Sequence, residues 1–154
     1  MKTFSTIVLI VILILALIYL IFGNNSSTFT ADIDGGVFKA DRGGARYRSG
    51  RLNISALHAA PDTTAVIIDL KATEVGTYLL NDDNPETGNV AAYYVGKNVF
   101  ASTSRFTGSV TITKLDMEEK KVSGTFVFRA VQVVPPGPKV VNVTNGAFED
   151  IPIS

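Results

Sequence analysis

Beyond residue 27 the chain alternates apolar and polar side chains with a period of two, and no other feature constrains its fold as strongly. Residues 29–33 alternate in this way, Gly35 and Gly36 supply a turn, and residues 37–40 form the next apolar run. Successive side chains of a strand point to opposite faces of a sheet. The pattern therefore predicts an antiparallel hairpin at the start of a β domain.

The same alternation recurs to the C-terminus, with turn residues between the runs. The strongest hairpin joins residues 108–115 to residues 122–131, and prolines at 135–138 precede a last expected strand at 139–143. No segment after residue 27 has an apolar stripe at helical spacing. We expect an all-β domain, an antiparallel β-sandwich or a small closed barrel of about eight or nine strands.

The N-terminus has a different character. Residues 7–22 read IVLIVILILALIYLIF, and the uncharged stretch 4–22 would be about 28 Å long as a helix, close to the thickness of a bilayer core. We expect a transmembrane signal-anchor helix within residues 1–23, a linker at 24–27 and an extracytoplasmic β domain at 28–154. A cleaved signal peptide is the alternative, although its small-residue cleavage site is poorly formed here.

The flanking charges predict the orientation of that anchor. Lys2 and the amino terminus precede the apolar run, and no charge follows it before Asp32. By the positive-inside tendency the N-terminus stays in the cytoplasm, and the domain lies in the periplasm or outside the cell. The expected partners are a membrane, through residues 4–22, and an envelope protein or glycan.

Charge and composition argue against several other functions. Lys plus Arg and Asp plus Glu both number 14, so the chain lacks the basic excess with which proteins hold nucleic acid. It has no cysteine, and a single histidine cannot build a histidine-based metal cluster. We therefore expect no catalytic residue, no cofactor and no enzymatic activity. His58 is most simply interpreted as a structural or surface residue.

Several segments resemble a known family. They are GTYL at 76–79, AYY at 92–94, GSVTITKLD at 108–116, VSGTFVF at 122–128 and VTNGAF at 143–148. Together they resemble an uncharacterised all-β domain family of Gram-negative cell-envelope lipoproteins. The resemblance implies a cell-envelope β domain and brings no activity or site residues. It departs from the family in one respect, since this chain has no lipid-bearing cysteine.

One cluster of basic residues is the best candidate for ligand binding. Residues 39–51 combine arginines, an aromatic residue and two glycine-containing pairs in what we interpret as a flexible loop. Arginine with an aromatic ring suits a carboxylated glycan, a phosphate group, an acidic protein face or anionic lipid. The candidates are Arg42, Arg46, Tyr47, Arg48 and Arg51.

Weaker candidates come from oxygen-bearing and aromatic side chains. Asp82, Asn84 and Glu86 alternate in a polar loop, as in the start of a calcium site, without the full twelve-residue spacing. Tyr93 and Tyr94 are adjacent on an expected strand, so only one of them faces any given surface. These two, with Tyr78, are better suited to packing than to a sugar-binding platform.

Three functions follow. The first is a non-catalytic, membrane-anchored binding or structural domain of the cell envelope. The second is an accessory subunit of an inner-membrane complex. The third is a hydrolase that uses carboxylates such as Asp69 or Asp82. We rank them in that order.

Overall fold

The structure, a computed structural model, describes residues 28–59 and 62–154. These residues form strands and turns, which confirms the all-β prediction, and they include no helix that could cross a membrane. The strands are β1 (Thr28–Ile33), β2 (Gly36–Lys39), β3 (Arg42–Arg48), β4 (Arg51–His58), β5 (Thr64–Leu70), β6 (Gly76–Leu80), β7 (Val90–Val95), β8 (Asn98–Ala101), β9 (Gly108–Asp116), β10 (Lys121–Val134) and β11 (Pro136–Pro152).

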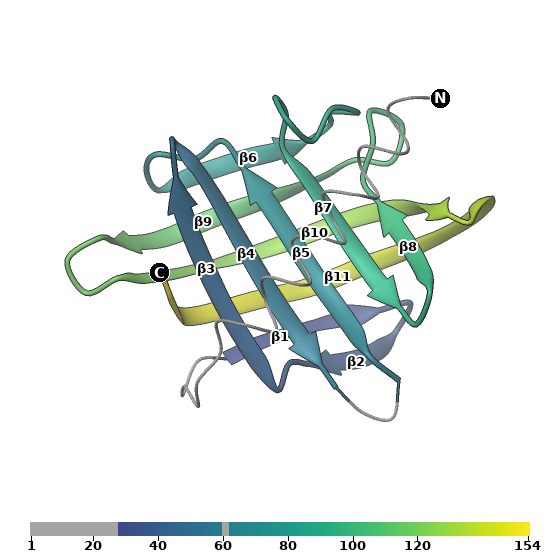
Figure 1. Cartoon of the computed structure of the whole chain (residues 1–154), viewed down its shortest axis with the longest axis horizontal. Helices are drawn as coiled ribbons and strands as arrows, with labels where there is room; N and C mark the ends of the chain where they lie inside the picture. The colour runs from purple at the N-terminus through teal and green to yellow at the C-terminus, as the bar shows by residue number, and fades with distance from the viewer. Residues whose placement is uncertain (1–27, 60–61) are drawn as a thin grey trace.

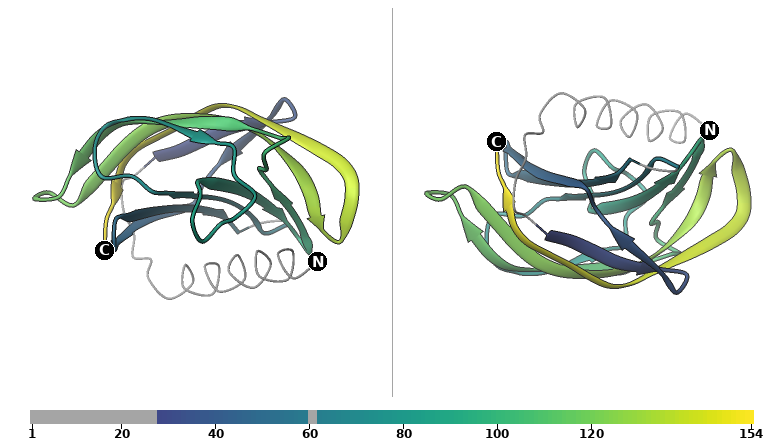
Figure 2. Two further views of the ribbon diagram at one scale, coloured as in Figure 1. Left: turned by 90° about the horizontal axis from the view of Figure 1, so that it is seen from above. Right: turned by 90° about the horizontal axis from the view of Figure 1, so that it is seen from below.

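All the strands of the described chain belong to one antiparallel sheet that curls over itself (Figure 1). β3, β4, β5, β7 and β8 form one layer, and β6, β9, β1 and β2 belong to the layer opposite (Figure 2). The long strand β10 connects the two layers. It pairs with β9 from Lys121 to Phe128 and with β8 from Val131 to Val134. β11 follows β10 along most of its length.

The curled sheet is a half-barrel, which corrects both architectures expected from sequence. It is not a sandwich of two separate sheets, because β10 and β11 run through both layers. It is not a closed barrel either, because β3 meets the C-terminal end only at the bridge between Ala45 and Ile153. The backbone N–H of Ser154 donates to the Ala45 carbonyl at 2.9 Å beside that bridge. The sheet has eleven strands rather than eight or nine.

Two segments account for most of the difference in strand content. Residues 42–48, expected to be a flexible loop, form β3 and pair with β4 from end to end. β11 begins at Pro136 and continues to Pro152, well beyond the strand expected at 139–143. The second half of β11 pairs with β1 as well as β10, so its backbone is hydrogen-bonded on both sides.

The core fills the space between the two layers. Four phenylalanines, Phe29, Phe38, Phe126 and Phe148, are buried around one another, and the rings of Phe29 and Phe126 lie 5.1 Å apart. The facing layer contributes buried aliphatic side chains from alternate positions of β4 and β5, namely Leu52, Ile54, Ala56, Val66, Ile68 and Leu70. Burial of this apolar surface is the main stabilising contribution to the fold.

Gly146 is required by the close packing of this aromatic cluster. A Cβ added at residue 146 would overlap the ring of Phe126, whereas one added at Gly137 would lie 3.4 Å from the end of the flexible Gln132 side chain. We expect Gly146→Ala to lower the free energy of unfolding by about 1–3 kcal/mol. Gly137→Ala is the matched control and should change it little. Equal effects of the two variants in urea unfolding would contradict this packing.

A second apolar cluster lies on the opposite face of the same layer. Alternate residues of β5 point to the two faces of the sheet, yet Ala65 and Ile67 are as apolar as Val66 and Ile68. The second cluster comprises Leu57, Ala65, Ile67, Ala92, Val99, Ala101 and Val133, all buried. This layer is therefore apolar on both faces, which the alternating pattern of an antiparallel sheet does not by itself predict.

Candidate functional site

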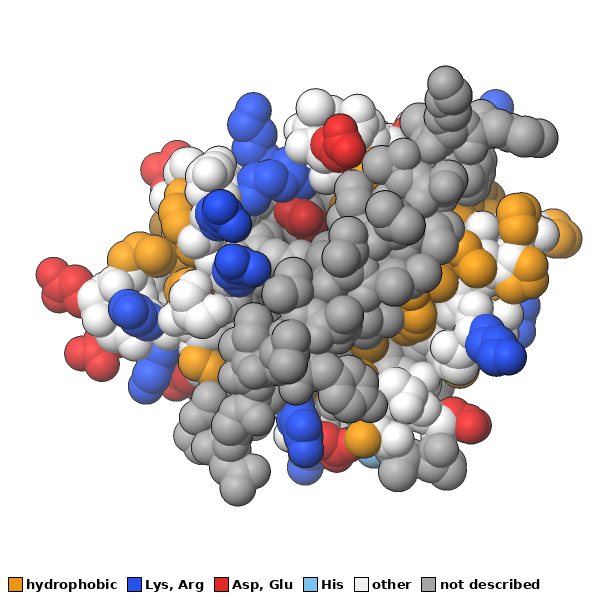
Figure 3. All heavy atoms as spheres, viewed as in Figure 1, with side chains coloured by type: hydrophobic (Ala, Val, Ile, Leu, Met, Phe, Trp, Pro, Cys, Tyr) orange, Lys and Arg blue, Asp and Glu red, His pale blue; other side chains and the backbone are white. Residues whose placement is uncertain are grey.

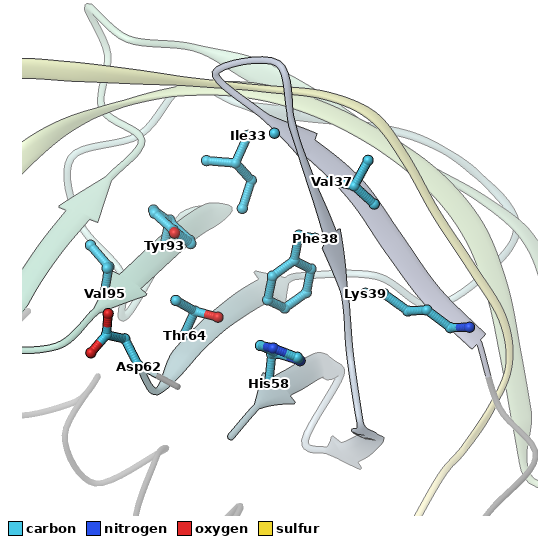
Figure 4. Close-up of a pocket in the computed structure, with 10 residues that line it drawn as sticks. Ile33, Val37, Phe38, Lys39, His58, Asp62, Thr64, Tyr93 and Val95 are labelled. Carbon is cyan, nitrogen blue, oxygen red and sulfur yellow. The ribbon is translucent and has the colours of Figure 1, made fainter. Parts of the chain in front are cut away.

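The open end of the half-barrel forms a cleft between the β1–β2 hairpin and the ends of β4, β5 and β7. Its volume is about 420 Å³. Figure 4 shows Phe38 reaching in from β2 toward Tyr93 and Thr64, with Ile33 and Val95 beside them. Val37 and Lys39, the neighbours of Phe38 on β2, also line the cleft. The cleft is therefore lined by both apolar and polar side chains.

Polar groups line one side of this cleft. Thr64, His58 and Asp62 contribute a hydroxyl, an imidazole and a carboxylate to its wall. Burial raises the pKa of the Tyr93 phenol, and the negative charge of Asp34 raises it further. Tyr93 thus stays protonated at neutral pH and keeps a hydroxyl that can donate a hydrogen bond. The cleft suits a small molecule with an apolar body and a hydrogen-bonding group at one end.

His58 is paired with an acidic residue at the edge of the cleft. Its Nδ1 lies 3.2 Å from Oδ2 of Asp41, and both side chains are partly exposed. The backbone N–H of Ala59 donates to Asp41 at 2.8 Å, and this bond, with the nearby His58, holds the pKa of the Asp41 carboxyl below its usual value. These contacts fit the structural interpretation of His58.

The structure brings three of the five candidate arginine-cluster residues together on one surface. Ala45 packs into the core, so Arg42, Arg46 and Arg48 point to the outer side of the edge strand β3, where all three are exposed. Figure 3, seen from this side, shows Lys and Arg side chains gathered where β3 lies. Tyr47 faces the other way and packs against the core.

Arg51 has a different position and different contacts. Its guanidinium lies 2.8 Å from Oδ1 of Asp69 and donates to the backbone carbonyls of Pro85, Glu86 and Gly88. Burial raises the pKa of Asp69, and the charge of Arg51 opposes that rise. Arg51 therefore fastens the 81–89 loop to β5. A ligand would have to replace these contacts to reach it.

The calcium candidates lie in that same loop and bind its backbone. Asp82 accepts a hydrogen bond from the N–H of Asn84 at 2.9 Å, and Asn84 accepts one from the N–H of Glu86 at 2.9 Å. These are local turns, in which short polar side chains cap backbone donors. Within residues 28–59 and 62–154 there is no group of three acidic, histidine or cysteine residues that could hold a metal ion.

The tyrosines take the places expected from their order along the chain. Tyr93 packs against the main core and Tyr94 against the second apolar cluster, so the two do point to opposite faces. The hydroxyl of Tyr78 donates to the carbonyl of Glu74 at 2.6 Å. The three tyrosines therefore make separate packing and hydrogen-bonding contacts and do not form one sugar-binding surface.

Sequence reasoning missed the cleft. Its walls come from β2, β4, β5 and β7, which are separated by long stretches of chain, and each residue taken alone is an ordinary strand residue. No local pattern in the chain pointed to it: that Phe38 is buried while its neighbour Val37 is exposed becomes visible only in the structure.

Comparison with known families confirms one part of the resemblance, namely that the chain contains an uncharacterised domain. The family model described as a domain of unknown function, DUF6252, matches residues 25–152. The chain belongs to this family. No curated protein and no solved structure matches the chain. The DUF6252 domain thus covers the whole half-barrel, and the apolar residues 4–22 precede it. The predicted anchor, its orientation and the 24–27 linker lie outside the described residues.

Proposed function

We propose that this DUF6252 chain is a non-catalytic binding domain of the cell envelope that is attached to a membrane through residues 4–22. The cleft at the open end of the half-barrel is the observation that carries the proposal. It combines apolar side chains, among them Phe38 and Tyr93, with the polar groups of His58, Asp62 and Thr64. Its ligand class is a small amphipathic molecule.

Membrane attachment is supported by the sequence and by the exposed arginines. The 4–22 stretch is uncharged and long enough to be buried in lipid, and only five residues separate Phe22 from the first residue of β1. A linker of that length keeps the domain at the membrane surface. Arg42, Arg46 and Arg48 then lie where the phosphates of anionic lipids can pair with them.

Filling the cleft tests the binding function. Thr64→Trp should occupy the cavity, whereas Thr113→Trp places the same side chain on an exposed position of β9. Native mass spectrometry of chain extracted from membranes should show a bound small molecule with the wild type and with Thr113→Trp. The spectrum of Thr64→Trp should show the chain without the bound molecule. A bound mass that persists in a folded Thr64→Trp variant would contradict the cleft as the site.

The arginine surface makes a separate prediction. Replacing Arg42, Arg46 and Arg48 by alanine, with Arg51 kept, should weaken the preference for anionic over zwitterionic vesicles by about 1 kcal/mol per arginine. The preference should also fall with added salt, because exposed charges are screened. The thermal midpoint should stay near that of the wild type. An unchanged vesicle preference in the triple variant would remove lipid headgroups as the partner of these arginines.

A further inference from the structure

Most of the second apolar cluster, together with Ser55 and the partly buried Tyr94, Val131 and Val134, forms two parallel rows across the outer face of the β4–β5–β7–β8 layer. Each row follows the register from one strand to the next, and reaches the end of β10. The first row is Leu57, Ala65, Tyr94, Val99 and Val134. The second row is Ser55, Ile67, Ala92, Ala101 and Val131. We refer to these two rows as the outer face.

The outer face has the properties of a packing surface. Ser55, Ala92 and Ala101 give the second row small side chains, which let another element approach the sheet closely. Among the described residues, no strand lies in front of this layer (Figure 1). A sheet with apolar side chains on both faces is stable in water only when a further layer covers each of them.

We propose that residues 7–22 of the same chain pack along the outer face, across its strands. The dimensions agree. The rows cross five strands, which at about 4.8 Å per strand gives a length of about 19 Å. Sixteen residues in a helix extend about 24 Å. The segment has no charged group, as an apolar surface of this kind requires.

The connection to β1 has the reach that this packing needs. Thr28 pairs with Glu149, and Ile153, four residues further along the chain, bridges to Ala45 on β3. Thr28 is therefore at most roughly 23 Å from Ala45 on β3, from about 3.3 Å per strand residue and one strand spacing at each end. The six Cα–Cα steps from Phe22 to Thr28 extend up to roughly 20–22 Å. Phe22 can therefore lie near β3 and Ile7 near β8.

The side of residues 7–22 that would face away from the sheet explains why this packing requires a membrane. Residues 7–22 are apolar all round, so a helix lying on the sheet would still present an apolar surface outward. Lipid can cover that surface and water cannot do so favourably. In this respect the inference rests on the proposed membrane attachment. It specifies the mode of attachment, in which the segment lies between the sheet and the lipid instead of crossing the bilayer.

Disulfide crosslinking in the full chain, reconstituted in sealed vesicles, tests this packing. The chain has no cysteine, so every crosslink reports an introduced pair. Ala101→Cys should crosslink within one chain to a cysteine placed at Leu9, Ile10 or Val11. Ser55→Cys should crosslink to one at Ile18, Tyr19 or Leu20. Val127 is an exposed residue of β10, so Val127→Cys is the matched control. It should form no crosslink with a cysteine at any of these N-terminal positions.

Labelling of the two chain ends separates packing from spanning. The variants Thr3→Cys and Ser154→Cys should both react with a membrane-impermeant maleimide added to the same side of the vesicle. Opposite sides, or crosslinks no stronger than those of Val127→Cys, would overturn the inference and leave membrane attachment intact. Crosslinks that join two chains only would overturn it as well. Failure of the chain to float with vesicles would instead refute the proposed attachment, and the crosslink pattern would still decide the packing.

Discussion

Phe126→Ala is expected to lower the free energy of unfolding by about 3–5 kcal/mol, as is usual for removing a buried phenylalanine. The Phe126 side chain is 4% exposed and its ring lies 5.1 Å from that of Phe29 and 6.1 Å from that of Phe148. Truncation leaves a cavity in the centre of the core, where both layers of the half-barrel meet the aromatic cluster. Urea unfolding followed by circular dichroism measures the loss.

The neighbouring residue is the control for that variant. Val127 is 47% exposed and points away from the core. Val127→Ala should change the free energy of unfolding by less than about 0.5 kcal/mol. If the two alanine variants were equally stable, residues 126 and 127 would not face the sides of the sheet described here, and the register of β10 would be wrong.

Arg51→Ala is expected to lower the free energy of unfolding by about 2–3 kcal/mol at neutral pH. It removes the partner of a largely buried carboxylate and the donor to three loop carbonyls. The double variant Arg51→Ala with Asp69→Asn should recover part of this loss, because no unpaired charge remains. If Arg51→Ala were as stable as wild type, the 81–89 loop would not depend on this contact.

The same variant carries a pH signature. Burial raises the pKa of Asp69 above its unfolded value, so its contribution to stability is complete below the unfolded pKa and is lost as pH rises from there through the folded pKa. Without Arg51 the pKa rises further. The difference in stability between wild type and Arg51→Ala should therefore shrink as pH falls through the pKa of Asp69. A difference that grew at acid pH would contradict this assignment.

Most strands could be predicted from the sequence because one face of each is packed and the other is exposed, which produces an alternating pattern of side chains. The hairpin expected at 108–115 and 122–131 is formed by β9 and β10, and in β10 buried side chains alternate with more exposed ones from Val122 to Ala130. β3 was missed because its sequence, RGGARYR, offers few side chains that favour strands. Its backbone pairing with β4 decides its structure. The prolines near residue 136 are tolerated because β1 pairs with β11 only between Val143 and Glu149.

The candidate site was predicted less completely than the fold. The sequence identified the basic cluster, but it could not separate Arg51, which is held by Asp69, from the three exposed arginines of β3. That separation depends on the register between β4 and β5. The cleft and the outer face depend on the curl of the sheet and on pairings between distant strands. No local pattern in the chain encodes them.

We propose that the DUF6252 domain works at a membrane to which its own N-terminal residues attach it. An alkaline carbonate wash of native membranes, followed by intact mass measurement of the pelleted chain, tests this most directly. We predict that the chain stays in the pellet and that its mass includes residues 4–22. A chain that is released by the wash, or whose mass shows that it begins near Asn24, would contradict the claim.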